Sequence, residues 1–166
     1  GYIYRDAATV GRLTIFYSRL RDMIETEEAD NGLMIFGNKG PGAELTGVEL
    51  ELERSLNRHV RVDGNLSYIS TEERESGLEL EGVANWLANA SLTYQPNSDY
   101  SLVLQYRFRG PRHRAPEDDR DKMAAESTLD LAASAFNVYY PGLTFQLGAV
   151  NLFDSDIYEP AAAGSY

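Results

Sequence analysis

The stretch Thr46-Gly47-Val48-Glu49-Leu50-Glu51-Leu52-Glu53 alternates aliphatic residues with glutamates. In an extended strand successive side chains point to opposite faces, so the aliphatic residues share one face and the glutamates share the other. Glutamate and leucine also favour helices, but helical spacing would scatter Val48, Leu50 and Leu52 around the cylinder. The pattern therefore predicts a β-strand over about residues 43–56, with one face that needs water.

The same alternation recurs along the rest of the chain. We predict further strands over about residues 1–5, 12–24, 60–70, 83–95, 100–109, 128–135 and 143–152. The breaks are short near 57–58, 95–99 and 140–142, and long and hydrophilic near 26–42, 71–82 and 110–123. The predicted fold is all-β, an antiparallel up-and-down meander with about seven to eight strands present. Tight turns at one end and long loops at the other are typical of a segment of a transmembrane β-barrel.

Charge and composition exclude several classes of protein. The 166 residues carry a formal net charge of -11 and contain no cysteine. Nucleic-acid binding requires clustered Lys and Arg, so we expect no nucleic-acid partner. Without cysteine these residues form no disulfide, thiolate metal site or cysteine nucleophile. No apolar run is long enough for a transmembrane helix, but a transmembrane strand needs only about 9–11 residues and exposes alternate side chains to lipid.

Alternation by itself does not say which face of the meander points outward. In a membrane barrel the apolar face meets lipid and the polar face lines a wet interior, which predicts lumen-facing Glu49, Glu51, Glu53, Arg61 and Arg107. About eight strands could instead close into a small barrel, either an outer-membrane structural protein or a soluble ligand carrier with its apolar face inward. The regular change between short and long breaks favours the membrane barrel.

One basic cluster lies in the long break at 110–123 and just before it. Arg109, Arg112, His113 and Arg114 are the candidate contacts for an anionic ligand or for lipopolysaccharide phosphates, because guanidinium groups bind carboxylates and phosphates well. The acidic residues 117–119 follow closely and could neutralise this charge within the loop.

The sequence offers little for catalysis or metal binding. His59 and His113 fall at a short turn and in a long loop, hence at opposite ends of the predicted sheet, which argues against a shared metal site. No G-x-S-x-G and no phosphate-binding glycine motif occurs. The row Glu49, Glu51 and Glu53 could serve acid–base chemistry or a cation path, but a solvated wall explains it more simply. We expect no enzyme, cofactor or metal; an outer-membrane hydrolase using His113 is the remaining alternative.

Three short motifs occur in a fixed order. Gly47-Val48-Glu49 is followed by Asn65-Leu66-Ser67-Tyr68, and then by Asn151-Leu152-Phe153-Asp154 with Tyr158 four residues on. This ordered set, which covers nearly the whole chain, resembles the C-terminal part of the β-barrel of TonB-dependent outer-membrane receptors. We interpret the motif residues as structural: Asn and Asp side chains bond to nearby backbone and end a ladder, while Leu152 and Phe153 anchor the rim.

The resemblance implies a barrel of about 22 strands with a plugged lumen, in the outer membrane of a Gram-negative bacterium. It also implies uptake of iron–siderophores, cobalamin or similar nutrients, powered by TonB, with outer-membrane lipid and lipopolysaccharide around the barrel. No part of the sequence resembles the plug domain, so we expect residues 1–166 to be a single β-barrel segment. TonB would act through the missing plug region, and the ligand itself is not specified.

Overall fold

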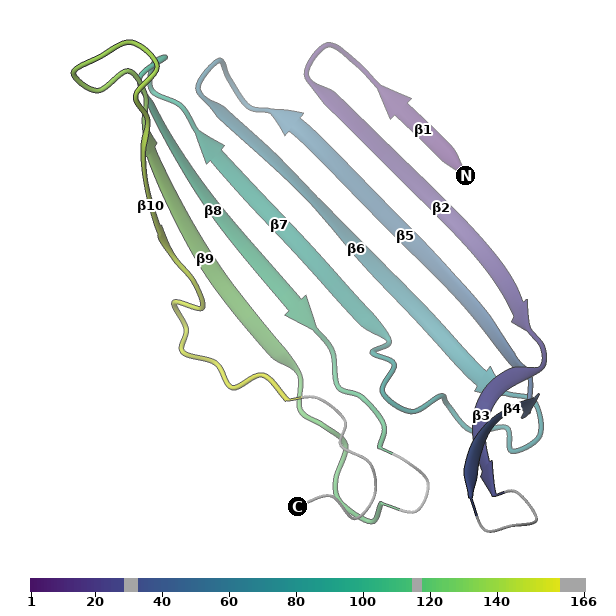
Figure 1. The fold of residues 1–166 in the computed structure, drawn as a ribbon. Helices are drawn as coiled ribbons and strands as arrows, with labels where there is room; N and C mark the ends of the chain where they lie inside the picture. Colours follow the sequence, from purple (N-terminus) through teal and green to yellow (C-terminus); the bar gives the residue numbers. More distant parts are fainter. Residues whose placement is uncertain (29–32, 115–117, 159–166) are drawn as a thin grey trace.

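The computed structural model describes residues 1–28, 33–114 and 118–158, which form strands and connecting loops (Figure 1). The strands are β1 (Tyr2–Arg5), β2 (Thr9–Leu20), β3 (Met23–Glu28), β4 (Met34–Gly40), β5 (Ala43–Ser55), β6 (Val60–Glu73), β7 (Trp86–Tyr94), β8 (Tyr100–Arg109), β9 (Glu126–Ala135) and β10 (Phe145–Ala149). Eight of them form one sheet in the order β1-β2-β5-β6-β7-β8-β9-β10, and β3 pairs with β4 in a separate hairpin. None of the described residues forms a helix that is long and apolar enough to cross a membrane.

Neighbouring strands of the main sheet are all antiparallel, so the chain runs up and down as a meander. The register places polar residues side by side: Arg12 lies opposite Glu51, and Glu51 lies opposite Asn65. The row continues through Asn89 to Arg107. Because side chains repeat with a period of two, aligning one polar row aligns the whole polar face. The prediction of an all-β antiparallel meander is confirmed.

The connections divide between the two ends of the sheet. Residues 6–8, 56–59, 95–99 and 136–144 form the shorter connections, at the top of Figure 1. The longer ones, 21–42, 74–85 and 110–125, lie at the bottom, where the β3–β4 hairpin also extends. This is the short–long rhythm that the sequence predicts.

The clearest differences between the predicted and observed elements concern two strands and one break. The strand predicted over 12–24 ends at Leu20, because Asp22 has a positive φ of 51° that turns the chain into β3. The break predicted over 26–42 therefore contains most of a hairpin; residues 29–32 within it lie outside the described residues. The last strand covers only Phe145–Ala149 rather than 143–152, because Asn151 has a φ of 52° and ends the extended backbone.

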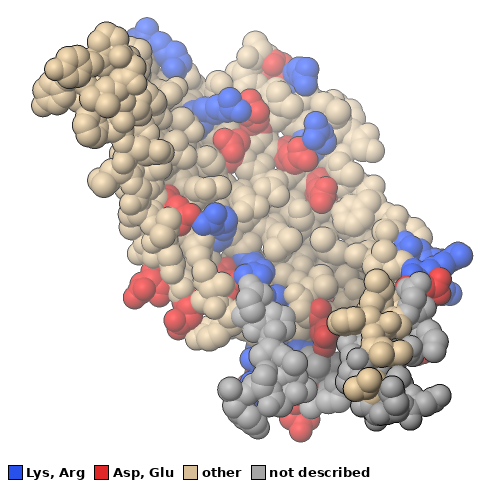
Figure 2. Space-filling model, viewed as in Figure 1, with Lys and Arg blue, Asp and Glu red and all other residues tan. Residues whose placement is uncertain are grey.

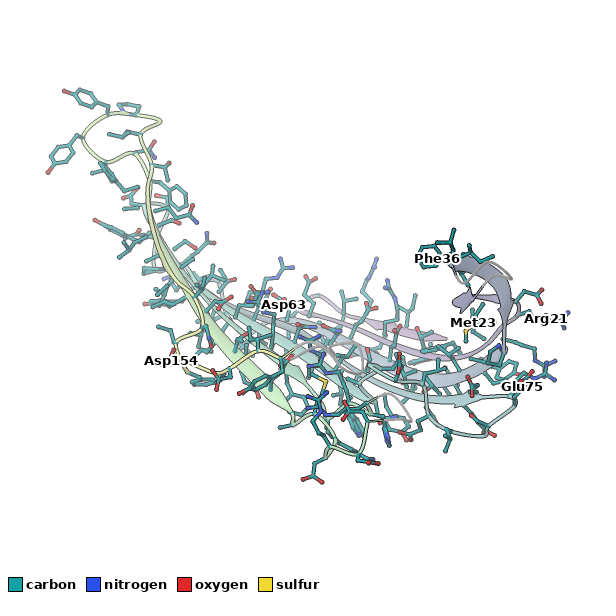
Figure 3. All side chains as sticks on the ribbon, turned by 60° about the horizontal axis from the view of Figure 1, so that its bottom comes forward. Arg21, Met23, Phe36, Asp63, Glu75 and Asp154 are labelled. Carbon is teal, nitrogen blue, oxygen red and sulfur yellow. The ribbon has the colours of Figure 1, made fainter. Side chains whose placement is uncertain are left out.

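The main sheet is a single curved layer. Figure 3 shows it bent into an open trough with Asp63 on the inner side. The hydrophobic side chains that are buried among the described residues are only Ala43, Ala84 and Met123. Leu50 and Leu66, on the outer face, remain 49% and 42% exposed. The apolar face is therefore not packed into a dry core within the described residues, as a soluble carrier would require.

The sheet does not close on itself. Strand β1 pairs only with β2, and β10 pairs only with β9, so within the described residues each has one unpaired edge. Open edges must be paired or covered in a stable protein. The alternative of a small, self-contained eight-stranded barrel therefore does not fit this arrangement, in which β1 and β10 are the two outer strands of an open wall.

Candidate functional site

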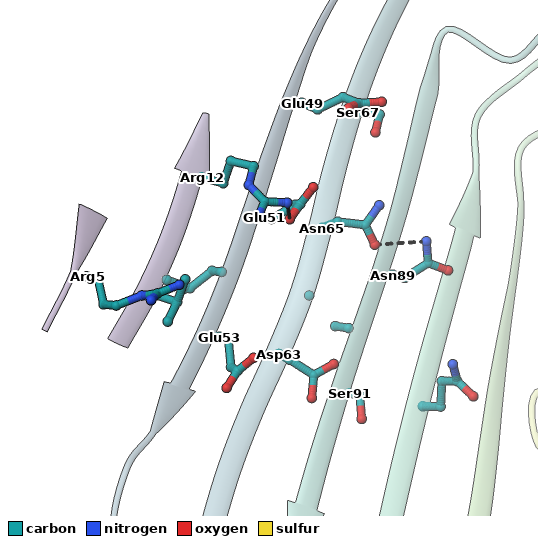
Figure 4. A pocket seen from close by; sticks show the side chains of 15 residues that line it. Arg5, Arg12, Glu49, Glu51, Glu53, Asp63, Asn65, Ser67, Asn89 and Ser91 are labelled. Atoms are coloured by element: carbon teal, nitrogen blue, oxygen red, sulfur yellow. Dashed lines mark hydrogen bonds and ion pairs between the residues drawn. The ribbon is translucent and has the colours of Figure 1, made fainter. Parts of the chain in front are cut away.

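The inner face of the trough carries a polar hollow of about 740 Å³ that spans β1 to β8 (Figure 4). Its side chains come from alternate positions of successive strands, which is why one face collects them. The predicted lumen-facing residues Glu49, Glu51 and Glu53 line it together. The other charged and polar lining residues include Arg5, Arg12, Asp63, Asn65, Ser67, Asn89, Ser91 and Gln105.

Charges on this face are arranged in pairs across neighbouring strands. Arg12 Nη1 lies 2.9 Å from Glu51 Oε2, and Arg61 Nη2 lies 3.0 Å from Glu53 Oε2. Arg107, the fifth predicted lumen-facing residue, pairs with Asp130 on β9. Figure 2 shows acidic and basic side chains side by side over this face. The first two pairs are half-exposed and contribute little stability. They nevertheless keep the inner face polar while partly neutralising its charge.

The predicted basic cluster is engaged with acidic groups of its own chain. Arg109 pairs with Glu126. Arg112 is 1% exposed, and its Nη2 lies 3.5 Å from Glu126 Oε1. His113 Nε2 lies 2.7 Å from Glu79 Oε2, which belongs to the preceding long loop. Arg109, Arg112 and His113 therefore each face a carboxylate of their own chain. This geometry agrees with charge neutralisation inside the protein.

Arg114 belongs to the same loop and contacts its acidic end. Its Nε donates to the carbonyl oxygen of Asp121 at 2.8 Å, and its Nη1 lies 3.7 Å from Asp118 Oδ2. Hydrogen bonds from Arg120 are the main cause that lowers the pKa of Asp118 to about 2. Asp118 therefore stays ionised and binds the two arginines at neutral pH.

The histidines lie at opposite ends of the sheet, as predicted. The Nδ1 atom of His59, in the connection between β5 and β6, lies 2.9 Å from the carbonyl oxygen of Gln95. His113 lies in the long connection between β8 and β9. Among the described residues, no group of three or more histidine, aspartate or glutamate side chains is placed to hold a metal ion.

The motif Asn151-Leu152-Phe153-Asp154 follows β10 and is held by side-chain hydrogen bonds. The Asn151 side chain accepts from Ser155 N at 3.1 Å and donates to the Ser155 carbonyl oxygen at 2.9 Å. The Phe153 ring packs edge-on against Tyr106, with centroids 6.4 Å apart. Asp154 also has a positive φ, of 51°. Left-handed backbone suits Asn and Asp better than most residues, which explains why these two types occupy the turn.

The sequence reasoning did not single out Glu126 and Asp130, two acids on the inner face of β9. Asp130 accepts from Asn151 N at 2.9 Å and Glu126 accepts from Tyr158 N at 3.2 Å, so both hold the segment after β10. The available signal was their spacing: Glu126, Thr128 and Asp130 alternate with Ser127 and Leu129. Their hydrogen-bond partners are distant in sequence, so no local pattern predicts these contacts.

A long-stranded antiparallel wall with a wet inner face, an uncovered apolar outer face and loops at one end defines a segment of a transmembrane β-barrel. Residues 1–152 match the family model described as TonB dependent receptor-like, beta-barrel. The chain belongs to this family, whose members are transporters of the Gram-negative outer membrane and not enzymes. No curated protein matches the chain.

Solved structures share the fold. The copper transporter OprC is 21% identical with a TM-score of 0.74, over 95% of this chain and 25% of its own. The ferric yersiniabactin uptake receptor FyuA from Yersinia pestis is 22% identical with a TM-score of 0.73, over 92% of this chain and 23% of its own. A mutant of the ferric enterobactin receptor PfeA from Pseudomonas aeruginosa is 22% identical with a TM-score of 0.73, over 92% of this chain and 24% of its own. The chain thus spans about a quarter of the length of the structures it matches.

Proposed function

We propose that this chain is part of the barrel wall of a TonB-dependent receptor that takes up a small nutrient, such as an iron–siderophore or cobalamin. The observation that carries the proposal is the sidedness of the sheet. Glu49, Glu51 and Glu53 line a hollow on the inner face, while Leu50 and Leu66 are exposed on the outer face. A wall between water and lipid has this distribution.

Under this proposal the outer face contacts membrane lipid and the longer connections lie at the cell surface, near lipopolysaccharide. TonB acts through a plug region that is not part of residues 1–166. Of the predicted ligand contacts, Arg109, His113 and Arg114 keep partly exposed side chains, at 33%, 33% and 23%. These three are the candidate contacts for an anionic ligand, whereas the buried Arg112 is not.

Uptake by the full-length receptor tests the proposal. The receptor gene is deleted, and the strain is supplied in turn with radiolabelled ferric siderophores, cobalamin and copper. We expect one class of ligand to enter at the wild-type rate only when both the receptor and TonB are present. Equal uptake of every ligand by the deletion strain and the wild type would argue against a nutrient receptor. A strain lacking TonB alone separates energised uptake from passive leakage.

A further inference from the structure

Arg112 is the most deeply buried large side chain of the described residues, although it lies in a long connection between strands. Its backbone joins two other segments. Arg112 N donates to the Met123 carbonyl oxygen at 3.1 Å and Met123 N donates back at 2.9 Å. Arg112 also forms an antiparallel bridge with Ala84 in the preceding loop. Residues 84, 112 and 123 therefore pair as three short segments of the chain, beyond the ends of β7, β8 and β9.

The Arg112 side chain reaches a fourth segment, which follows β10. Its Nη2 donates to the carbonyl oxygen of Tyr158 and also lies 3.5 Å from Glu126 Oε1. Tyr158 N donates in turn to Glu126 Oε2 at 3.2 Å. Both backbone polar groups of Tyr158 are thus held, one by a cation and one by an anion. We name Arg112, Glu126 and the backbone of Tyr158 the rim clamp.

The neighbouring residue extends the coupling to the loop between β6 and β7. His113 Nε2 pairs with Glu79, and the His113 carbonyl oxygen accepts from Gly82 N at 2.9 Å. Arg112 and His113 therefore connect, through adjacent residues, the loop at 74–85, the loop at 110–125 and the segment at 150–158. A guanidinium suits this role because its planar fork can serve several acceptors at once.

We propose that Arg112 is a positioning residue: through the rim clamp it orders the β6–β7 loop, the β8–β9 loop and the segment after β10 as one unit, and it does not contact ligand itself. An arginine 1% exposed has no surface to offer a ligand. A buried charge is stable only when it is paired and hydrogen-bonded, and the Arg112 guanidinium has both kinds of partner in the rim clamp. The proposal is independent of which nutrient is transported and would stand if the proposed function failed.

Limited trypsin cleavage of the full-length receptor in outer-membrane vesicles tests this proposal. Cleavage is scored by mass spectrometry after Lys122, an exposed residue next to the buried Met123. Proteolysis follows the population of the opened loop, and a hydrogen bond to a charged group is worth enough to change that population about tenfold. We expect Arg112→Met to be cleaved about tenfold faster than wild type, with the barrel still heat-modifiable on a gel. Arg112→Lys should restore part of the protection.

Two matched pairs of variants provide the controls: Arg112→Met with Arg12→Met, and Tyr158→Pro with Tyr158→Phe. Arg12→Met removes an arginine from a half-exposed pair on the inner wall and should leave cleavage unchanged. Tyr158→Pro removes the N–H that binds Glu126, and Tyr158→Phe keeps it, so only the proline variant should be cleaved faster. If Arg112→Met does not fold, the Tyr158 pair decides alone. Wild-type cleavage rates in Arg112→Met, or in Tyr158→Pro, would overturn the proposal.

Discussion

At Gly47 the sheet leaves no room for a side chain. A Cβ there would lie 2.4 Å from Phe16 Cζ and 2.7 Å from the Tyr68 carbonyl oxygen, and the backbone oxygen cannot move aside as a ring can. We expect Gly47→Ala to destabilise the receptor by about 1–3 kcal/mol, measured by urea titration in lipid vesicles. Gly11→Ala is the control, because its Cβ would have no atom nearer than 3.9 Å. Equal losses for both variants would contradict this account.

The pKa of Asp118 makes one loop sensitive to acid. Arg120 is the main cause that lowers this pKa from 3.8 to about 2. A carboxyl group whose pKa is lower in the folded protein stabilises the fold at pH values above its unfolded pKa. This stabilisation is lost as the pH falls through the folded pKa. We therefore expect the loop around Asp118 to open as the pH falls from about 4 to about 2, measured as pepsin cleavage of the receptor. Asp118→Asn removes this titration, so a pH profile identical to wild type would refute the prediction.

Among the elements, the β3–β4 hairpin depends least on the rest. Its strands pair with each other and not with the main sheet, and Phe36 is 82% exposed (Figure 3). A hairpin that does not pack against other elements adds little to the stability of the whole protein. We expect a receptor in which residues 23–40 are replaced by a short glycine–serine turn to insert and to keep its heat stability. Failure of this variant to form a heat-modifiable barrel would show that the hairpin supports the wall.

How well each element was predicted depends on where its determinants lie. The sequence predicts β5 to within one residue of its observed end, because Val48, Leu50 and Leu52 alternate with glutamates locally. The sequence predicts a break over 26–42 where the structure has most of the β3–β4 hairpin, because the glutamates of β3 resemble a hydrophilic loop. The sequence predicts Arg112 only as a candidate ligand contact, because its hydrogen-bond partner Tyr158 is 46 positions away and gives no local signal. A single sequence shows periodicity but not such distant pairing.

At the scale of the whole molecule, β6 presents opposite surroundings at adjacent positions. Leu66 lies on the outer face, opposite Leu50 of β5, while Asn65 lies on the inner face, opposite Glu51. If the outer face meets hydrocarbon, an arginine there is costly and an arginine on the wet face is not. We expect Leu66→Arg to cost about 2–4 kcal/mol when the full receptor folds into lipid vesicles.

Asn65→Arg provides the matched comparison, since it introduces the same side chain one residue away. It loses one exposed hydrogen bond, from Asn89 at 3.1 Å, and places the new charge near Glu51. Its cost should therefore stay within about 1 kcal/mol. Both variants are measured by the same urea titration. If Asn65→Arg proved the more damaging, the inner and outer faces would have to be exchanged, and with them the assignment of the polar hollow to a water-filled lumen.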